Sequence, residues 1–193
     1  MNELEIKIKK LDERAVIPTY SHVGDVGMDI TAIDIEYDEE KDMYIYHTGL
    51  AFESPFNIGQ FLFLRSSNSK KECYLCNHVG IADSAIYRGE IQFRMKNRDS
   101  IDTIATNEAV SQALNEMSLS NYKECNLKNF SEIFLNKKNE IYNKAKKLEY
   151  APYKVGDRIG QMVFLEYPTV NLIEVDSLSD TERGSGGFGS SGN

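Results

Sequence analysis

Short alternating segments separated by turn residues are the feature that most limits how this chain can fold. Residues 4–9 and 90–96 alternate apolar with polar side chains, and residues 43–46 and 60–64 are rich in aromatic and other strand-forming residues. A period of two is typical of strands that bury one face. Several short strands joined by turns predict a β-sandwich or β-barrel up to about Asn97.

A helical pattern interrupts the strands between Arg98 and Tyr150. Apolar residues recur there at helical spacing in two groups, Ala109, Val110, Ala113, Leu114 and Met117, then Phe130, Ile133, Phe134, Ile141 and Ala145. Strand patterns resume at 155–165 and 171–175. The sequence therefore predicts a mainly β fold made of residues 1–100 and 149–182, a helical insertion at 101–148, and a Gly-rich arm at 183–193.

Composition and charge narrow the class of protein. The chain has 193 residues and a net charge of −8, which argues against binding to duplex nucleic acid because phosphates require a basic face. It has no apolar stretch near 18 residues and no signal-peptide pattern at its start, so we expect no membrane contact. Three cysteines cannot all pair within one chain, so a reducing cytoplasm is the expected location.

The arm of residues 183–193 contains five glycines and three serines, together with Arg183 and Phe188. Glycine-flanked amides can wrap an anion, an arginine can bind phosphate with two hydrogen bonds, and an aromatic ring can stack on a base. The arm therefore suits a nucleotide. A flexible Gly/Ser linker is the alternative interpretation, although its arginine and phenylalanine argue against it.

Three other segments carry polar groups at the ends of apolar runs. Residues 24–29 form a glycine-spaced acidic turn, Arg65, Ser66 and Ser67 follow an apolar strand, and Asp83 lies in a hairpin. Each also has a structural interpretation, because acidic turns and Arg/Ser loops are common on protein surfaces. As functional groups they offer phosphate ligands and a general base.

Taken together, these segments resemble the five motifs of the trimeric dUTPases, in the family order and over nearly the whole β-portion. The matching stretches are residues 26–30, 65–67, 77–83 with 87–91, 156–162 and 183–192. The resemblance implies a jelly-roll β-barrel subunit with a flexible Gly-rich C-terminal arm. It also implies a homotrimer with sites shared between subunits, and hydrolysis of dUTP to dUMP and pyrophosphate.

The resemblance assigns roles within the nucleoside half of the site. Asp83 is expected to act as the general base that activates the water attacking the α-phosphorus, and to hold the sugar 3′-hydroxyl. Tyr87 is expected to pack against the deoxyribose and exclude a 2′-hydroxyl. The uracil edge is read by the Asn77 side chain and by backbone groups of Gly80, Ile81 and Ala82.

The resemblance also assigns the residues that bind the phosphates of the nucleotide. Arg65, Ser66, Ser67 and Gln161 are expected to hold the phosphates, and Arg183 is expected to close over them with arm amides, including those of Gly189 and Ser190. Phe188 is expected to cover the uracil face, and Gln92 is included among the substrate-binding residues.

Mg²⁺ is the expected cofactor, because it binds substrate phosphates while it keeps several waters. Asp29 and Gln161 are the expected contacts to it, through water. The three histidines are not at ligand spacing with one another, and the Cys73–Cys76 pair lacks the clear ligand set of a structural zinc site.

Three departures from the family pattern and two alternatives stay open. One extra residue lies between Asp83 and Tyr87, so anchoring on Tyr87 would put Ser84 in the catalytic place. Leu64 replaces a usual proline, and Ala82 a larger aliphatic residue. A dCTP deaminase is disfavoured because Arg94 stands where that enzyme needs a glutamate.

The second alternative is a nucleotide-switched regulatory protein that docks on another protein through the insertion. Some phage members of the family carry an insertion at this place, so the resemblance is to a phage-type member. Lysines outnumber glutamates within residues 121–148, which would suit a protein partner.

Overall fold

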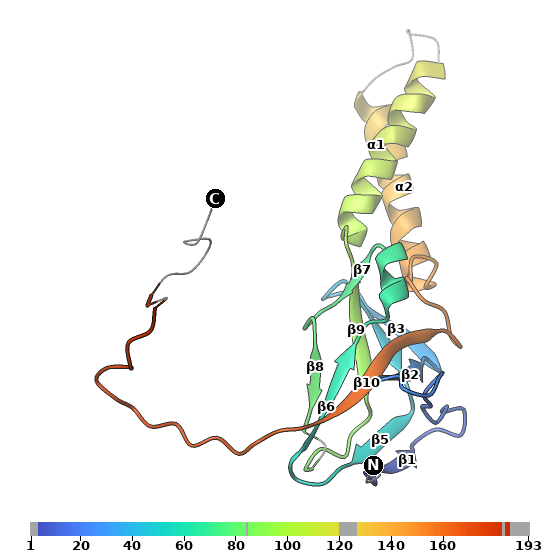
Figure 1. Cartoon of the computed structure of the whole chain (residues 1–193). Coiled ribbons are helices and arrows are strands. Elements are labelled where there is room, and N and C mark those ends of the chain that lie inside the picture. The colour runs from blue at the N-terminus through green and yellow to red at the C-terminus, as the bar shows by residue number, and fades with distance from the viewer. Residues whose placement is uncertain (1–3, 84, 120–126, 183, 186–193) are drawn as a thin grey trace.

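Ten short strands and two helices make up the folded part of the described chain (Figure 1). The computed structural model describes residues 4–83, 85–119, 127–182 and 184–185. The elements are β1 (Lys7–Lys10), β2 (Met28–Thr31), β3 (Asp34–Asp38), β4 (Met43–His47), β5 (Leu50–Glu53), β6 (Ile58–Phe63), the 3₁₀ helix η1 (Ser66–Lys70), β7 (Cys73–Leu75), β8 (Gly80–Ala82), β9 (Gln92–Asn97), α1 (Ile101–Leu119), α2 (Leu127–Lys146) and β10 (Arg158–Glu166).

The strands form two four-stranded antiparallel sheets and one two-stranded pair. The first sheet has the order β2-β10-β6-β8, the second has the order β3-β4-β9-β7, and β1 pairs with β5. Neighbours in both sheets are mostly far apart in sequence, as expected for a jelly-roll and not for a simple meander. The predicted mainly β class is confirmed.

Alternation along the strands builds the core between the two sheets. Tyr44 and Tyr46 on β4 and Phe93 on β9 point inward and are fully buried. Gly160 on β10 faces this core, where a Cβ atom would lie 2.1 Å from the Phe93 ring. The absence of a side chain at this glycine therefore lets the two sheets approach closely.

The two helices form an antiparallel hairpin that rises from one end of the β-sandwich (Figure 1). Ala105, Ala109 and Ala113 of α1 are fully buried at a spacing of four, because small side chains allow close helix packing. At the base, Ile141 and Ala145 of α2 belong to a cluster that extends onto barrel tyrosines. No helix in the described ranges is long and apolar enough to cross a membrane.

The segment after α2 returns to the core before β10 begins. The N–H of Tyr153 donates to the Tyr46 hydroxyl (3.1 Å), and the two rings pack edge to face at 6.1 Å. This contact anchors the chain just ahead of β10, so that β10 enters between β2 and β6 in a fixed register.

The strand expected at residues 171–175 is not formed, and this expectation was wrong for the single chain. Residues 167–182 contain no helix or strand and extend away from the barrel (Figure 1). Leu172 is 89% exposed and Leu178 is 86% exposed. A strand needs a neighbour for its backbone hydrogen bonds, and the described part of the chain provides none for this segment.

Candidate active site

A pocket of about 380 Å³ opens between β8 and β9. Its lining includes seven of the residues predicted from the sequence: Asn77, Gly80, Ile81, Ala82, Asp83, Tyr87 and Gln92. Leu62, Leu75, Glu90, Ile91 and Arg94 complete it. β8 and β9 belong to different sheets, so the β-hairpin expected around Asp83 is not formed. The predicted residues are instead brought together by β8, β9 and the loop between them, on an apolar floor with a polar rim (the hairpin pocket).

The turn between Asp83 and Tyr87 absorbs the extra residue. The N–H groups of Ile86 and Tyr87 donate to the Asp83 carbonyl oxygen, at 2.9 and 2.7 Å. The Tyr87 hydroxyl then donates to the Glu90 carbonyl oxygen (3.0 Å), and a Cβ on Gly89 would clash with the tyrosine ring. Asp83 and Tyr87 therefore line the same pocket. Ser84 lies outside the described residues.

The backbone of β8 is available for base recognition. This strand is the last in its sheet and pairs only with β6, through Gly80 with Leu62 and Ala82 with Gln60. Its other edge therefore presents backbone N–H and C=O groups that take no part in the sheet ladder. Fixed main-chain donors and acceptors can distinguish bases by their hydrogen-bonding edge.

A second polar cluster surrounds Asp29 on β2. Its carboxylate accepts from Arg65 Nε (2.9 Å) and Gln161 Nε2 (3.3 Å) on Oδ1, and from Arg158 Nη1 (2.9 Å) and Ser21 Oγ (3.2 Å) on Oδ2. The Asp29 side chain is only 9% exposed. Two guanidinium groups are thus held side by side by one carboxylate, which leaves one net positive charge at this place, and guanidinium groups suit phosphate.

Arg158 and Ser21 were not singled out from the sequence. Arg158 lies within the same motif as Gln161, at residues 156–162, so its position was a usable signal; Ser21 carries no comparable signal. Ser66 and Ser67 follow Arg65 directly at the start of η1 and are exposed. Arg183, Phe188, Gly189 and Ser190 lie outside the described residues.

The two clusters face different directions within one chain. Asp29 pairs with Gln161, and Gln161 with Phe63, on the outer face of the first sheet, whereas Leu62 pairs with Gly80 on the inner face. Successive side chains along a strand point to opposite faces. As a result none of Asp29, Arg65 and Gln161 lines the hairpin pocket.

Within the described residues, no group of three or more His, Cys, Asp or Glu side chains is arranged to hold a metal ion. Burial raises the pKa of the Cys73 thiol to about 11, which disfavours the thiolate that zinc requires, and Cys76 is exposed. For Mg²⁺, the oxygens of Asp29 and Gln161 are of the right chemical type. Both Asp29 oxygens already accept two donors each, so the substrate phosphates would have to supply most of the coordination.

Comparison with known proteins shows the family of the chain. A sequence model of the dUTPase family matches residues 140–192. The deoxyuridine 5′-triphosphate nucleotidohydrolase of Desulfitobacterium hafniense is 32% identical over 198 residues, covering 100% of this chain and 99% of that protein. The chain belongs to the dUTPase family.

Two solved phage structures share the fold. The dUTPase of Staphylococcus bacteriophage 80alpha with dUpNHpp has a TM-score of 0.61 and 20% identity, covering 98% of this chain and 99% of that one. It is described as controlling transfer of virulence genes by a G protein-like mechanism. A variant dUTPase of S. aureus phage phi11, described with a structural Mg(II) ion, has a TM-score of 0.54 and 20% identity, covering 90% and 97% of the two chains.

The Asp29 cluster predicts a specific loss of stability. Asp29→Asn keeps the shape but leaves two guanidinium groups without their anion, so we expect the free energy of unfolding in urea to fall by about 1–3 kcal/mol. Asp34→Asn is the matched control, because Asp34 is exposed and its one ion pair, with Arg14, is long at 3.4 Å. The control should change stability by less than about 0.5 kcal/mol. Equal effects of the two substitutions would contradict the central role of Asp29.

Proposed function

We propose that this protein hydrolyses dUTP to dUMP and pyrophosphate. The observation that carries the proposal is the hairpin pocket, which gathers Asp83, Tyr87 and Asn77 beside the free edge of β8. Membership of the dUTPase family, whose curated relatives are named for this activity, supports the same reaction.

The proposed chemistry is a direct displacement at the α-phosphorus. Water attacks the phosphorus, and the bond to the oxygen that bridges the α- and β-phosphates breaks. Asp83 takes the proton from the attacking water, and pyrophosphate leaves. The exposed position of Asp83 at the mouth of the pocket gives its carboxylate access to water, and general bases usually contribute about 10²–10⁴-fold to rate.

Selection of the nucleoside is assigned to the walls of the same pocket. The Tyr87 ring is fixed by its hydroxyl contact with the Glu90 carbonyl and, in our proposal, leaves no room for a 2′-hydroxyl. Asn77 and the backbone of Gly80, Ile81 and Ala82 are proposed to read the uracil edge. Gln92 completes the polar rim.

The phosphate half is assigned to the Asp29 cluster and to the arm. Arg65, Ser66, Ser67 and Gln161 are proposed to hold the triphosphate, with Arg183, Phe188, Gly189 and Ser190 closing over it. Mg²⁺ is proposed to bind with the phosphates and to neutralise part of their charge, with Asp29 and Gln161 as its contacts through water.

We further propose that the active unit is a homotrimer in which each site is shared. The two halves of the site face different directions in one chain, so a second chain is needed to bring them together. The outer face of the first sheet also leaves Ile81 and Leu165 exposed, and residues 167–182 carry further uncovered apolar side chains. The proposed setting is the cytoplasm, in keeping with the free thiols of Cys73 and Cys76.

Catalysis by Asp83 can be tested by one isosteric substitution. Asp83→Asn should lower kcat for dUTP by about 10²–10⁴-fold, because the amide cannot accept the proton, while the Kd for dUpNHpp changes only a few-fold. Asp99→Asn, an exposed change outside the pocket, serves as the control. Near-normal turnover by Asp83→Asn would remove the residue from its assigned role.

Assembly can be tested on the extended segment. Leu172→Asp with Leu178→Asp should shift the mass measured by sedimentation from trimer toward monomer, because charges would have to be buried against a neighbour. Both side chains are exposed in the single chain, so the substitutions should not unfold the monomer. Glu174→Gln is the control on the same segment. An unchanged trimer would show that this segment does not hold the assembly together.

A regulatory function through the helical hairpin is the second candidate. The 80alpha relative is described in a regulatory setting, and Leu114 and Leu135 of the hairpin are exposed here. The lysines favour this candidate less than the sequence suggested, because four of them, Lys137, Lys138, Lys144 and Lys146, pair with acids of the same chain.

Shortening the helical hairpin of α1 and α2 tests dUTP hydrolysis and protein docking separately. Replacing residues 106–140 by a Gly/Ser turn keeps the buried base, Ile101, Ala105, Ile141 and Ala145, so the barrel should still fold. We expect dUTP turnover within about two-fold of the full chain, since all of the proposed site residues lie outside the replaced segment. A host protein that is captured by the full chain and lost by the shortened one would support docking. Identical captured proteins would leave only the enzyme.

A further inference from the structure

Glu90 separates the hairpin pocket from a second hollow behind it. This hollow, of about 400 Å³, is lined among others by Asp12, Arg14, Asp34, Glu36, His47 and Glu90. Glu90 is the one residue that lines both cavities. The sequence motifs assigned no role to Glu90, although this residue lies between the two cavities.

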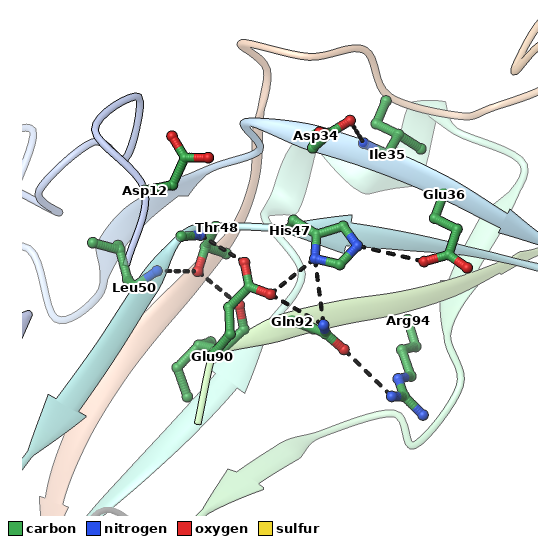
Figure 2. Close-up of polar contacts among 12 residues, drawn as sticks. Asp12, Asp34, Ile35, Glu36, His47, Thr48, Leu50, Glu90, Gln92 and Arg94 are labelled. Carbon is green, nitrogen blue, oxygen red and sulfur yellow. Dashed lines mark hydrogen bonds and ion pairs between the residues drawn. The ribbon is translucent and has the colours of Figure 1, made fainter. Parts of the chain in front are cut away.

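Three donors fix the Glu90 carboxylate. Oε1 accepts from the Gly49 N–H (2.7 Å), and Oε2 accepts from the Gln92 amide (3.1 Å) and lies 2.8 Å from His47 Nδ1 (Figure 2). Because an ionised carboxylate only accepts, Nδ1 of His47 carries the proton in this contact. Burial acts to raise the pKa of Glu90, but these three hydrogen bonds outweigh it and lower the pKa below its ordinary value.

Glu90 in turn orients Gln92 at the rim of the pocket. The Gln92 amide nitrogen points to Glu90, and its oxygen accepts from Arg94 Nη2 (3.3 Å) (Figure 2). An amide with a carboxylate on one side and a guanidinium on the other has a single favourable orientation, since a flip would place two donors and two acceptors together. The contact with Glu90 therefore determines which atoms Gln92 and Arg94 present to the pocket.

His47 is held from its other side as well. Its Nε2 lies 3.7 Å from Glu36 Oε2 on β3, so the imidazole lies between two carboxylates (Figure 2). The nearby charges of the hollow are largely used elsewhere, because Arg14 pairs with Asp12 and Asp34. The 2.8 Å contact with Glu90 is the closer of the two carboxylate contacts, and the contact with the exposed Glu36 carboxylate is long.

Further hydrogen bonds connect Glu90 and Ile91 to Thr48, Leu50 and Tyr87. Thr48 Oγ1 donates to the Ile91 carbonyl oxygen (2.7 Å), and the Ile91 N–H donates to the Leu50 carbonyl oxygen (2.9 Å). The Glu90 carbonyl oxygen accepts the Tyr87 hydroxyl. Movement of Glu90 would thus move both the partner of Tyr87 and the orientation of Gln92.

We propose that Glu90, held in place by His47, is a positioning residue that sets Gln92 and Tyr87 for recognition of the nucleoside. This inference rests on the proposed function of the pocket. Neither Glu90 nor His47 needs to touch the reacting atoms, so their loss should weaken substrate binding and leave the chemical step at Asp83 nearly intact.

The test compares substrate affinity with turnover in the full-length protein. Glu90→Gln keeps the shape and removes the charge, and His47→Phe removes both ring nitrogens. We expect each to raise KM for dUTP and Kd for dUpNHpp by roughly 10-fold, the effect of losing one well-placed hydrogen bond to a charged group, with kcat within about two-fold. His47→Asn, which keeps a side-chain donor near the Nδ1 position, should recover most of the affinity.

Controls separate positioning from general damage. The double variant should be no weaker than the worse single variant, because the two residues act as one unit. Glu36→Gln, on the far side of the imidazole, should leave KM within about two-fold. If His47→Phe fails to fold, the isosteric Glu90→Gln still decides the matter. An unchanged Kd in a normally melting Glu90→Gln protein, or a fall in kcat without a change in Kd, would overturn the inference. A wild-type protein that neither binds dUpNHpp nor hydrolyses dUTP would instead overturn the proposed function, and the inference with it.

Discussion

The insertion of β10 between β2 and β6 is the constraint on which the site depends. Its register puts Gln161 opposite Asp29, and the Asp29 carboxylate then gathers Arg65 and Arg158 on the outer face of the first sheet. Alternation along the neighbouring strand sends Leu62, and with it Gly80 of β8, to the inner face. One strand position therefore separates the Asp29 cluster from the hairpin pocket within each chain.

The single chain also leaves much apolar surface uncovered. The outer face of the first sheet and residues 167–182 expose side chains that a stable monomer would ordinarily bury, such as Leu172 and Leu178. The proposed shared site would account for both facts, because a neighbouring chain that supplies the missing half could also cover these surfaces. The helical hairpin stands apart from this arrangement, on one end of the barrel (Figure 1).

The sequence predicted the parts of the molecule that depend on local pattern. Strand patterns gave β1, β4, β6, β9 and β10, helical spacing gave α1 and α2, and the resemblance gave seven of the residues that line the pocket. What it could not give depends on contacts between distant segments. The pairing of His47 with Glu90 joins residues 43 positions apart, and neither has a distinctive local signal.

The error at residues 171–175 has the same origin. Their apolar alternation is a genuine strand signal, but a strand forms only where a partner offers its backbone, and the single chain offers none among its described residues. Local pattern alone therefore could not show that the described part of the chain offers this segment no neighbouring strand.

Complementation between two inactive chains tests the shared site most directly. Arg65→Ala removes a proposed phosphate ligand from the Asp29 cluster, and Asp83→Asn removes the proposed general base from the hairpin pocket. Each variant alone should therefore be nearly inactive toward dUTP. If each site takes its halves from two chains of a cyclic trimer, co-refolding equal amounts should restore about a quarter of the wild-type activity, because about one interface in four then joins two intact halves. Activity that stays at the level of the separate variants, in mixed trimers confirmed by mass, would show that one chain builds the whole site and would contradict this account.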